Sequence, residues 1–407
     1  MRLDHSNETR TLSESKQGVS ALAYALRRLI DFEAAWIAYF PDFEDKICIG
    51  LSLDSTAQAL LAASHRLEEQ ITVKPVYIAS ESLAQAFNIA SAYKDLNKIR
   101  AFIYSMSDSI LQTSKRLKKE LDPLYDQPGL AALRTITEYL EDKILVLEDH
   151  NWNSTIAESF QLEVSNSNVD TWREDTFRPE LLKTPARPSV LIQSDQSILN
   201  APSSQLIESQ EGIQRLLHFI YADIEVLAAE VCAYNIAEYG QTMPLQFIAD
   251  MARQCADEAR HAIMVGNMLE AYGGKLGDFT YTNRVWTSYS KGRDLPEKLA
   301  IQQIIDEGNG LDSSASLIAA FAKKDMRELV KLYQFLLADE TVHCAFGNRW
   351  MQWLVDYQPE RYEAVIDAGL EIGGSRLPGG APLNLEGRRA AEYPDWFIDK
   401  RLAPRHT

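Results

Sequence analysis

The predicted fold is decided by two matched stretches, Asp257-Glu258-Ala259-Arg260-His261 and Asp339-Glu340-Thr341-Val342-His343. In each stretch a Glu and a His stand three residues apart, so on an α-helix both side chains lie on one face, about one turn from each other. An isolated glutamate precedes each stretch at the same interval: Glu225 lies 33 residues before Glu258, and Glu307 lies 33 residues before Glu340. The repeated interval predicts two copies of one helical hairpin.

A turn lies midway between the two carboxylates of each copy. In the first copy, Gly240-Gln241-Thr242-Met243-Pro244 has the Gly after one helix and the Pro in the first turn of the next that mark such a turn. The second copy breaks near Lys323-Lys324-Asp325, again close to the midpoint. Two antiparallel hairpins packed together would bring four Glu and two His to one place inside a four-helix bundle, which is the arrangement of di-iron and di-manganese carboxylate proteins.

Converging carboxylates in an apolar interior call for a cation, because an unpaired buried carboxylate is strongly unfavourable. The predicted metal ligands, through which catalysis would occur, are Glu225, Glu258, His261, Glu307, Glu340 and His343. Asp257 and Asp339 stand four residues before the histidines, and each is expected to orient the non-ligating ring nitrogen of the His on its own helix. Carboxylate and imidazole ligands suit iron and manganese alike, so we expect two Fe ions, with Mn or a mixed Mn/Fe pair as the alternative. Buried structural salt bridges or solvated helix faces are the plainer reading of the same residues.

The isolated glutamates have rivals. Glu230 lies five residues after Glu225, and Glu238 is a further candidate in the same helix, but only Glu225 gives the matched interval. In the second copy Asp306 competes with Glu307.

Two glycines and three side chains near the predicted ligands add candidates. Gly308 and Gly310 follow Glu307, and because each Gly inside a helix costs about 1 kcal/mol relative to Ala, they predict a local distortion, a close approach beside the metal, or a simple helix break. The candidate pocket residues are Tyr221, one turn before Glu225, Cys255, three residues before Glu258, and Tyr333, seven residues before Glu340. Aromatic residues at helical spacing are more often part of a core.

Composition limits the classes of partner. The chain has 407 residues, of which 46% are hydrophobic and 24% charged, so it can form two domains with sizeable cores. A net charge of −17 argues against nucleic acid or an anionic membrane surface as the main partner. Four scattered cysteines without C-x-x-C spacing indicate neither a zinc ribbon nor a disulfide framework, and the N-terminus has no apolar signal region. We therefore expect a cytoplasmic protein that does not span a membrane.

The remaining chain predicts a second helical bundle and a linker. Apolar residues at helical spacing predict four N-terminal helices, at residues 19–40, 42–71, 82–119 and 130–147, with a strand at residues 47–53 as an alternative for the start of the second. The predicted organisation is a degenerate helical bundle without metal ligands at 1–150, a Pro-containing linker at 151–205, the metal-binding bundle at 206–360 and an irregular tail at 361–407 that packs back on the bundles.

These residues resemble the ferritin-like superfamily, whose rubrerythrin, ferritin and bacterial multicomponent monooxygenase branches share paired Glu and Glu-x-x-His. Over residues 205–395 the chain is more closely similar to a poorly characterised bacterial ferritin-like family distantly related to the tRNA-modifying non-haem iron hydroxylases. The stretches that carry this resemblance are the two motifs with Glu307-Gly308-Asn309-Gly310-Leu311-Asp312, Gly347-Asn348-Arg349-Trp350 and Pro382-Leu383-Asn384-Leu385-Glu386-Gly387-Arg388-Arg389. The resemblance implies an all-α fold, a ferritin-like four-helix bundle in tandem with a degenerate N-terminal bundle, and the same six metal ligands.

The expected function is that of a non-haem dinuclear iron or manganese oxidoreductase, a di-iron carboxylate oxygenase or oxidase. It would use O₂ as co-substrate to oxidise or oxygenate a small organic substrate. The alternatives are a ferroxidase or peroxide-handling protein, a metal-stabilised scaffold without redox catalysis, and a tRNA hydroxylase, against which the net charge counts. An electron-donor protein and a second copy of the chain in a homodimer are the protein partners that this interpretation allows.

Overall fold

The structure is a computed structural model of the chain, and it describes residues 12–68, 81–154, 180–194 and 203–402. The chain divides into two compact units: the first comprises Met1–Ala186 with Ile236–Ala256, and the second comprises Arg187–Asn235 with Asp257–Thr407. The described residues form helices and one isolated bridge, between Gln193 and Tyr281, and contain no strand. The predicted all-α fold is therefore confirmed.

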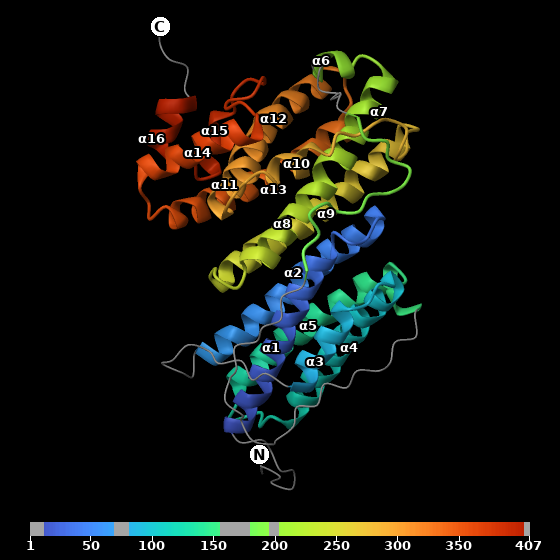
Figure 1. Cartoon of the computed structure of the whole chain (residues 1–407), viewed down its shortest axis with the longest axis vertical. Helices are drawn as coiled ribbons and strands as arrows, with labels where there is room; N and C mark the ends of the chain where they lie inside the picture. Colours follow the sequence, from blue (N-terminus) through green and yellow to red (C-terminus); the bar gives the residue numbers. More distant parts are fainter. Residues whose placement is uncertain (1–11, 69–80, 155–179, 195–202, 403–407) are drawn as a thin grey trace. The chain divides into compact units, whose positions relative to one another are not determined.

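The first unit is built on four long helices that pack against one another (Figure 1). Its elements are α1 (Leu12–Trp36), α2 (Phe43–Glu68), α3 (Glu81–Ser91), α4 (Leu96–Glu120), α5 (Gln127–Asp149) and η1 (Trp152–Ser154). Residues 47–53 lie within α2, so the strand alternative is wrong. The single helix predicted over 82–119 is two helices, because Asp95 caps α4 by accepting a hydrogen bond from the Asn97 amide. Lys143 and Glu33 form an ion pair in the core, both fully buried.

One described helix of this unit meets a simple test for a membrane span. By length and hydropathy alone, Phe43–Leu67 could cross a bilayer. However, 67% of its most apolar window is buried inside the structure, and the core helix of a globular protein passes the same test. The predicted absence of a membrane span therefore stays a prediction.

The second unit contains the second predicted hairpin and the ligand-bearing parts of the first (Figure 1). In chain order its elements are α6 (Ser203–Leu206), α7 (Gln210–Phe219), η3 (Ile220–Glu225), α8 (Val226–Tyr239), α9 (Leu245–Ala271), α10 (Arg284–Tyr289), α11 (Leu295–Leu299), η4 (Ala300–Asp306), α12 (Glu307–Lys323), α13 (Arg327–Leu354), α14 (Pro359–Gly373), α15 (Leu385–Ala390), α16 (Asp395–Phe397) and η5 (Ile398–Leu402), with parts of α8 and α9 in the residue range of the first unit. The turns between α8 and α9 and between α12 and α13 fall where the sequence predicts them.

The predicted domain boundaries cannot all be placed on described residues. Most of the linker expected at 151–205 lies outside them, at residues 155–179 and 195–202. The four-part organisation at 1–150, 151–205, 206–360 and 361–407 therefore stays a prediction.

Candidate metal centre

The second unit brings the six predicted ligands together. They form two overlapping groups of four residues. The first group is Glu225, Glu258, His261 and Glu340, and the second is Glu258, Glu307, Glu340 and His343. Within each group, every residue offers one ligand atom, and these four atoms all lie within 4.8 Å of one another. Glu258 and Glu340 belong to both groups. Two adjacent cation positions bridged by two shared carboxylates fit this arrangement. All six side chains are buried, with exposures of at most 7%.

The imidazole rings present the same nitrogen to the carboxylates. His261 Nδ1 lies 3.3 Å from Glu225 Oε2 and 3.3 Å from Glu258 Oε2. His343 Nδ1 lies 3.1 Å from Glu258 Oε1 and 3.1 Å from Glu340 Oε2. Within the described residues, the buried Glu225 Oε2 and His261 Nδ1 atoms have no hydrogen-bond partner. Since such atoms are costly to bury unpaired, the donor set fits metal ions.

The two aspartates contact the histidines, but not in the predicted pairs. Asp339 Oδ2 lies 3.1 Å from His261 Nε2, and Asp257 Oδ2 lies 3.5 Å from His343 Nε2. Asp339 therefore holds His261 of the other hairpin by a hydrogen bond, and Asp257 faces His343 of the other hairpin without one, so the pairing predicted within each helix is wrong. The reason is that an Asp directly before the ligand Glu is rotated about 100° from it around the helix, so its carboxylate faces the neighbouring helix.

Arg260 links the two aspartates, and the sequence reasoning missed it. Its Nη2 donates to Asp257 Oδ1 and to Asp339 Oδ2, each at 2.7 Å. The guanidinium is 38% exposed, so it closes the solvent side of the network that holds both imidazoles. A signal was available in the sequence, since Asp257 and Arg260 stand three residues apart and must share a helix face.

Each isolated glutamate lies at the end of a π-helical segment. Glu225 is the last residue of η3 (Ile220–Glu225), and Glu307 directly follows η4 (Ala300–Asp306). The wider π turn shifts the register of the side chains that follow it, and such segments occur often at functional sites. No residue pattern indicated the segment before Glu225, whereas Gly308 and Gly310 indicated a distortion near Glu307.

Burial and mutual repulsion divide the carboxylates of the metal-free protein into two kinds. Burial raises the pKa of Glu225 to about 8. Burial, with the charges of Glu340 and Glu258, holds the pKa of Glu307 well above its usual range. Burial also acts to raise the pKa of Glu340, but the charge of His343, which forms a hydrogen bond with Glu340 at 3.1 Å, holds that pKa well below its usual range. Without cations the cluster therefore retains protons, which bound metal ions would displace.

The rival carboxylates lie outside both groups. Glu230 is buried, but it forms an ion pair with Arg187 at 2.7 Å. Glu238 is exposed. Asp306 accepts hydrogen bonds from Ser375 at 2.9 Å and from Arg284 at 3.4 Å. Of the alternatives weighed, Glu225 and Glu307 are thus the two that join the cluster.

The C-terminal segment packs on α12 beside Glu307. Arg388 is fully buried and donates to Asp312 Oδ2 at 2.8 Å, and the Tyr393 hydroxyl donates to the Ile304 carbonyl at 2.5 Å. A Cβ at position 308 would meet both the Tyr393 hydroxyl and the Arg388 guanidinium well inside 3.0 Å. Nothing lies within 4 Å of a Cβ at position 310. Close approach beside the candidate metal centre, one of the predicted explanations, therefore applies to Gly308 and not to Gly310.

The three candidate pocket residues differ in their surroundings. Tyr333 is 2% exposed and packs in an apolar cluster, against which the partly buried Tyr221 also packs. Cys255 is buried and belongs to neither ligand group. None of the three is shown to touch a substrate, so their role as pocket residues stays a prediction.

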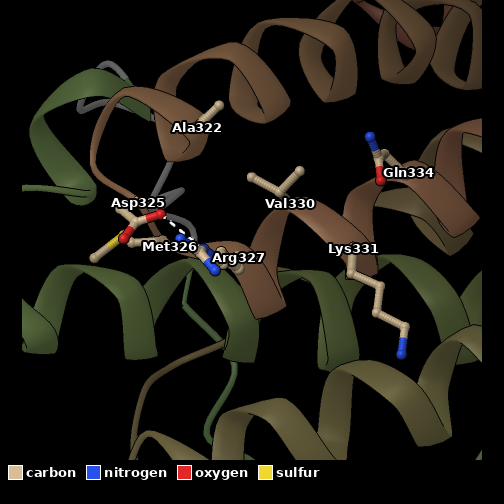
Figure 2. Close-up of a pocket in the computed structure, with 7 residues that line it drawn as sticks. All are labelled: Ala322, Asp325, Met326, Arg327, Val330, Lys331 and Gln334. Atoms are coloured by element: carbon tan, nitrogen blue, oxygen red, sulfur yellow. Dashed lines mark hydrogen bonds and ion pairs between the residues drawn. The ribbon is translucent and has the colours of Figure 1, made fainter.

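A surface pocket with a volume of about 240 Å³ lies at the turn between α12 and α13. Figure 2 shows its lining residues, Ala322, Asp325, Met326, Arg327, Val330, Lys331 and Gln334. None of the predicted ligands lines this pocket, so it is distinct from the carboxylate–histidine cluster.

The fold and the cluster define an all-α helical-bundle protein with a buried carboxylate–histidine site that could bind metal. The model of a family described as "Protein of unknown function (DUF455)" matches residues 142–399, and the chain belongs to this family. An "Uncharacterized protein" of Haemophilus influenzae (strain ATCC 51907 / DSM 11121 / KW20 / Rd) is 27% identical over 149 residues, which cover 35% of this chain and 51% of that protein. The chain thus matches about half the length of this curated relative. No solved structure matches the chain.

Proposed function

We propose that this protein is a non-haem dinuclear oxidoreductase of the ferritin-like superfamily, which uses O₂ to oxidise or oxygenate a small organic substrate. The observation that carries the proposal is the pair of overlapping ligand groups that share Glu258 and Glu340. Two carboxylates shared by the two ligand groups would hold two cations close together, as in the dinuclear carboxylate bundles. An ordinary network of buried salt bridges has no reason to repeat a set of three carboxylates and one imidazole twice.

The residues of the cluster have separate roles in this proposal. Glu258 and Glu340 would bridge the two ions, whereas Glu225 and Glu307 would each bind one ion only. Asp339 accepts the Nε2 proton of His261, and Asp257 lies 3.5 Å from His343 Nε2, so the Nδ1 atom of each ring faces the carboxylates. Two iron or manganese ions bound here would supply the electron transfer that O₂ reduction requires.

The surroundings of the cluster suit such chemistry. The six ligands are buried, and α9 and α13, which carry four of them, also contribute residues to a buried apolar cluster with α6, α7 and α12. A water-poor interior strengthens electrostatic interactions and protects a reactive oxidant from side reactions. The electron donor, the substrate, the homodimer and the cytoplasmic location remain parts of the proposal.

Metal binding and oxygen consumption test the proposal. Purified protein is titrated anaerobically with Fe(II), bound iron is measured by elemental analysis, and O₂ uptake is then followed with an electrode. We expect two ions per chain. Glu258→Gln and Glu340→Gln alter ligands of both positions and should weaken the binding of both ions. Glu225→Gln and Glu307→Gln should weaken the binding of one ion more than that of the other.

Glu270→Gln is the matched control, because Glu270 lies on α9 like Glu258 but is exposed. It should bind iron like the unmodified chain. If the Glu258 and Glu340 variants bind as much iron as this control, the proposed metal site is wrong. If two ions bind but O₂ uptake does not exceed ferrous autoxidation with any substrate class, a metal-stabilised scaffold replaces the oxidoreductase. Rapid disproportionation of peroxide by the manganese form would favour a peroxide-handling protein.

A further inference from the structure

Tyr333 carries a buried hydroxyl that has no hydrogen-bond partner among the described residues. The residue lies on α13, two helical turns before Glu340, and its side chain is 2% exposed. Burial, followed by the charge of Glu225, raises the pKa of this phenol well above its usual range. The hydroxyl therefore keeps its proton and remains a hydrogen-bond donor. A buried donor without a partner is destabilising, so its position calls for a ligand that the protein itself does not supply.

The surroundings of Tyr333 are otherwise apolar. It packs in a cluster with Leu329, Leu332, Leu336, Leu317, Phe321, Val265 and Leu269, and its ring centroid lies 5.4 Å from that of Phe321. The same cluster reaches the first ligand group, because Tyr221 packs against it one turn before Glu225, and Val265 lies one turn after His261. The cluster thus forms the apolar layer next to the Glu225 side of the candidate metal centre.

The two isolated glutamates differ in their polar contacts. Glu307 Oε1 accepts a hydrogen bond from Gln302 at 3.1 Å. Glu225 Oε2, by contrast, lies 3.3 Å from His261 Nδ1 without a hydrogen bond from any described residue, and the charge of Glu225 also acts on Tyr333. The residue seven positions before Glu258, which corresponds to Tyr333 in the first hairpin, is Met251. The Tyr333 hydroxyl thus has no counterpart at the equivalent position of the first hairpin.

We propose that Tyr333 donates a hydrogen bond to a small exogenous ligand, of the size of azide, hydroxide or O₂, bound at the first position beside Glu225. The inference rests on the proposed dinuclear metal site. It makes the two halves of that site unequal, because the residue that corresponds to Tyr333 in the first hairpin is Met251. Tyr333 is therefore a ligand-binding residue rather than part of a structural network.

Azide is the probe for this site. The oxidised iron-loaded protein is titrated with sodium azide, and binding is followed by the charge-transfer absorption of the complex. Tyr333→Phe should raise the dissociation constant for azide roughly 10-fold, which corresponds to about 1.4 kcal/mol of binding free energy. Because the hydroxyl has no partner in the described part of the chain, the same variant should leave the melting temperature of the metal-free protein unchanged or slightly raised.

Tyr289→Phe is the matched control. The Tyr289 hydroxyl is also buried, but it donates to Asn235 Oδ1 at 3.0 Å. This variant should lower the melting temperature and leave azide affinity unchanged. Equal azide affinity for Tyr333→Phe and the unmodified protein, with iron retained, overturns the inference, and so does a loss of stability in Tyr333→Phe as large as in Tyr289→Phe. If the unmodified protein binds no iron, elemental analysis shows that the proposed function itself has failed.

Discussion

Replacing Gly308 and Gly310 by alanine should change stability in opposite directions, although both glycines lie in the first turn of α12. A Cβ at position 308 would meet the Tyr393 hydroxyl and the Arg388 guanidinium well inside 3.0 Å. Neither group can move freely, because Tyr393 is bonded to the Ile304 carbonyl and Arg388 is paired with Asp312. A Cβ at position 310 would meet nothing within 4 Å.

The magnitude follows from three contributions. Alanine in place of glycine inside a helix gains about 1 kcal/mol in either variant. At position 308 the overpacking costs about 1–3 kcal/mol, and displacement of Tyr393 from its hydrogen bond costs about 1 kcal/mol more. Gly308→Ala should therefore lose about 1–3 kcal/mol, whereas Gly310→Ala should gain about 1 kcal/mol. For a domain of 150–250 residues, each kcal/mol shifts the melting temperature by roughly 2–4 °C.

Urea denaturation of the metal-free protein measures both variants, with helix content followed by circular dichroism and melting temperatures recorded in parallel. Both alanines add the same methyl group to the same helix, so helix propensity cancels in the comparison. If both variants are stabilised, or if both melting temperatures shift by the same amount, then Arg388 and Tyr393 do not exclude a side chain at position 308. The account of Gly308 as a close-approach position would then be wrong.

Three further predictions concern pH, the Asp–His network and the first unit. The metal-free protein should lose stability as pH rises from about 4.5 to about 8, because folded Glu225 keeps a proton that the unfolded chain has released. Urea denaturation at several pH values measures this loss, and bound metal should remove the contribution of Glu225. Arg260→Gln should lower metal affinity by about 10–100-fold by freeing Asp257 and Asp339, and unchanged titrations with Fe(II) would contradict this. Lys143→Met should lower the free energy of unfolding by about 3–5 kcal/mol, because it leaves Glu33 buried and unpaired. The double variant with Glu33→Leu should recover most of that stability, and a double-mutant cycle measured by urea denaturation tests both expectations.

Local periodicity made most of the helices and the ligand cluster predictable. The 3.6-residue turn places Glu258 and His261 on one face whatever surrounds them, and the repeated interval of 33 residues predicts the second hairpin from the first. Gly240 and Pro244 fix the turn by backbone chemistry alone. These features are properties of short segments, so the sequence was sufficient to predict that six side chains come together.

Contacts between helices were decided by the tertiary structure. The sequence did not show that Asp257 faces His343 rather than His261. Nor did it show that Glu230 forms an ion pair with Arg187 and lies outside the ligand groups. It also did not show that Arg388, from the C-terminal segment, packs against Gly308. Helical spacing determines which residues share a face, but the partner of each face depends on the rotation and offset of the packed helices, which many distant side chains set together.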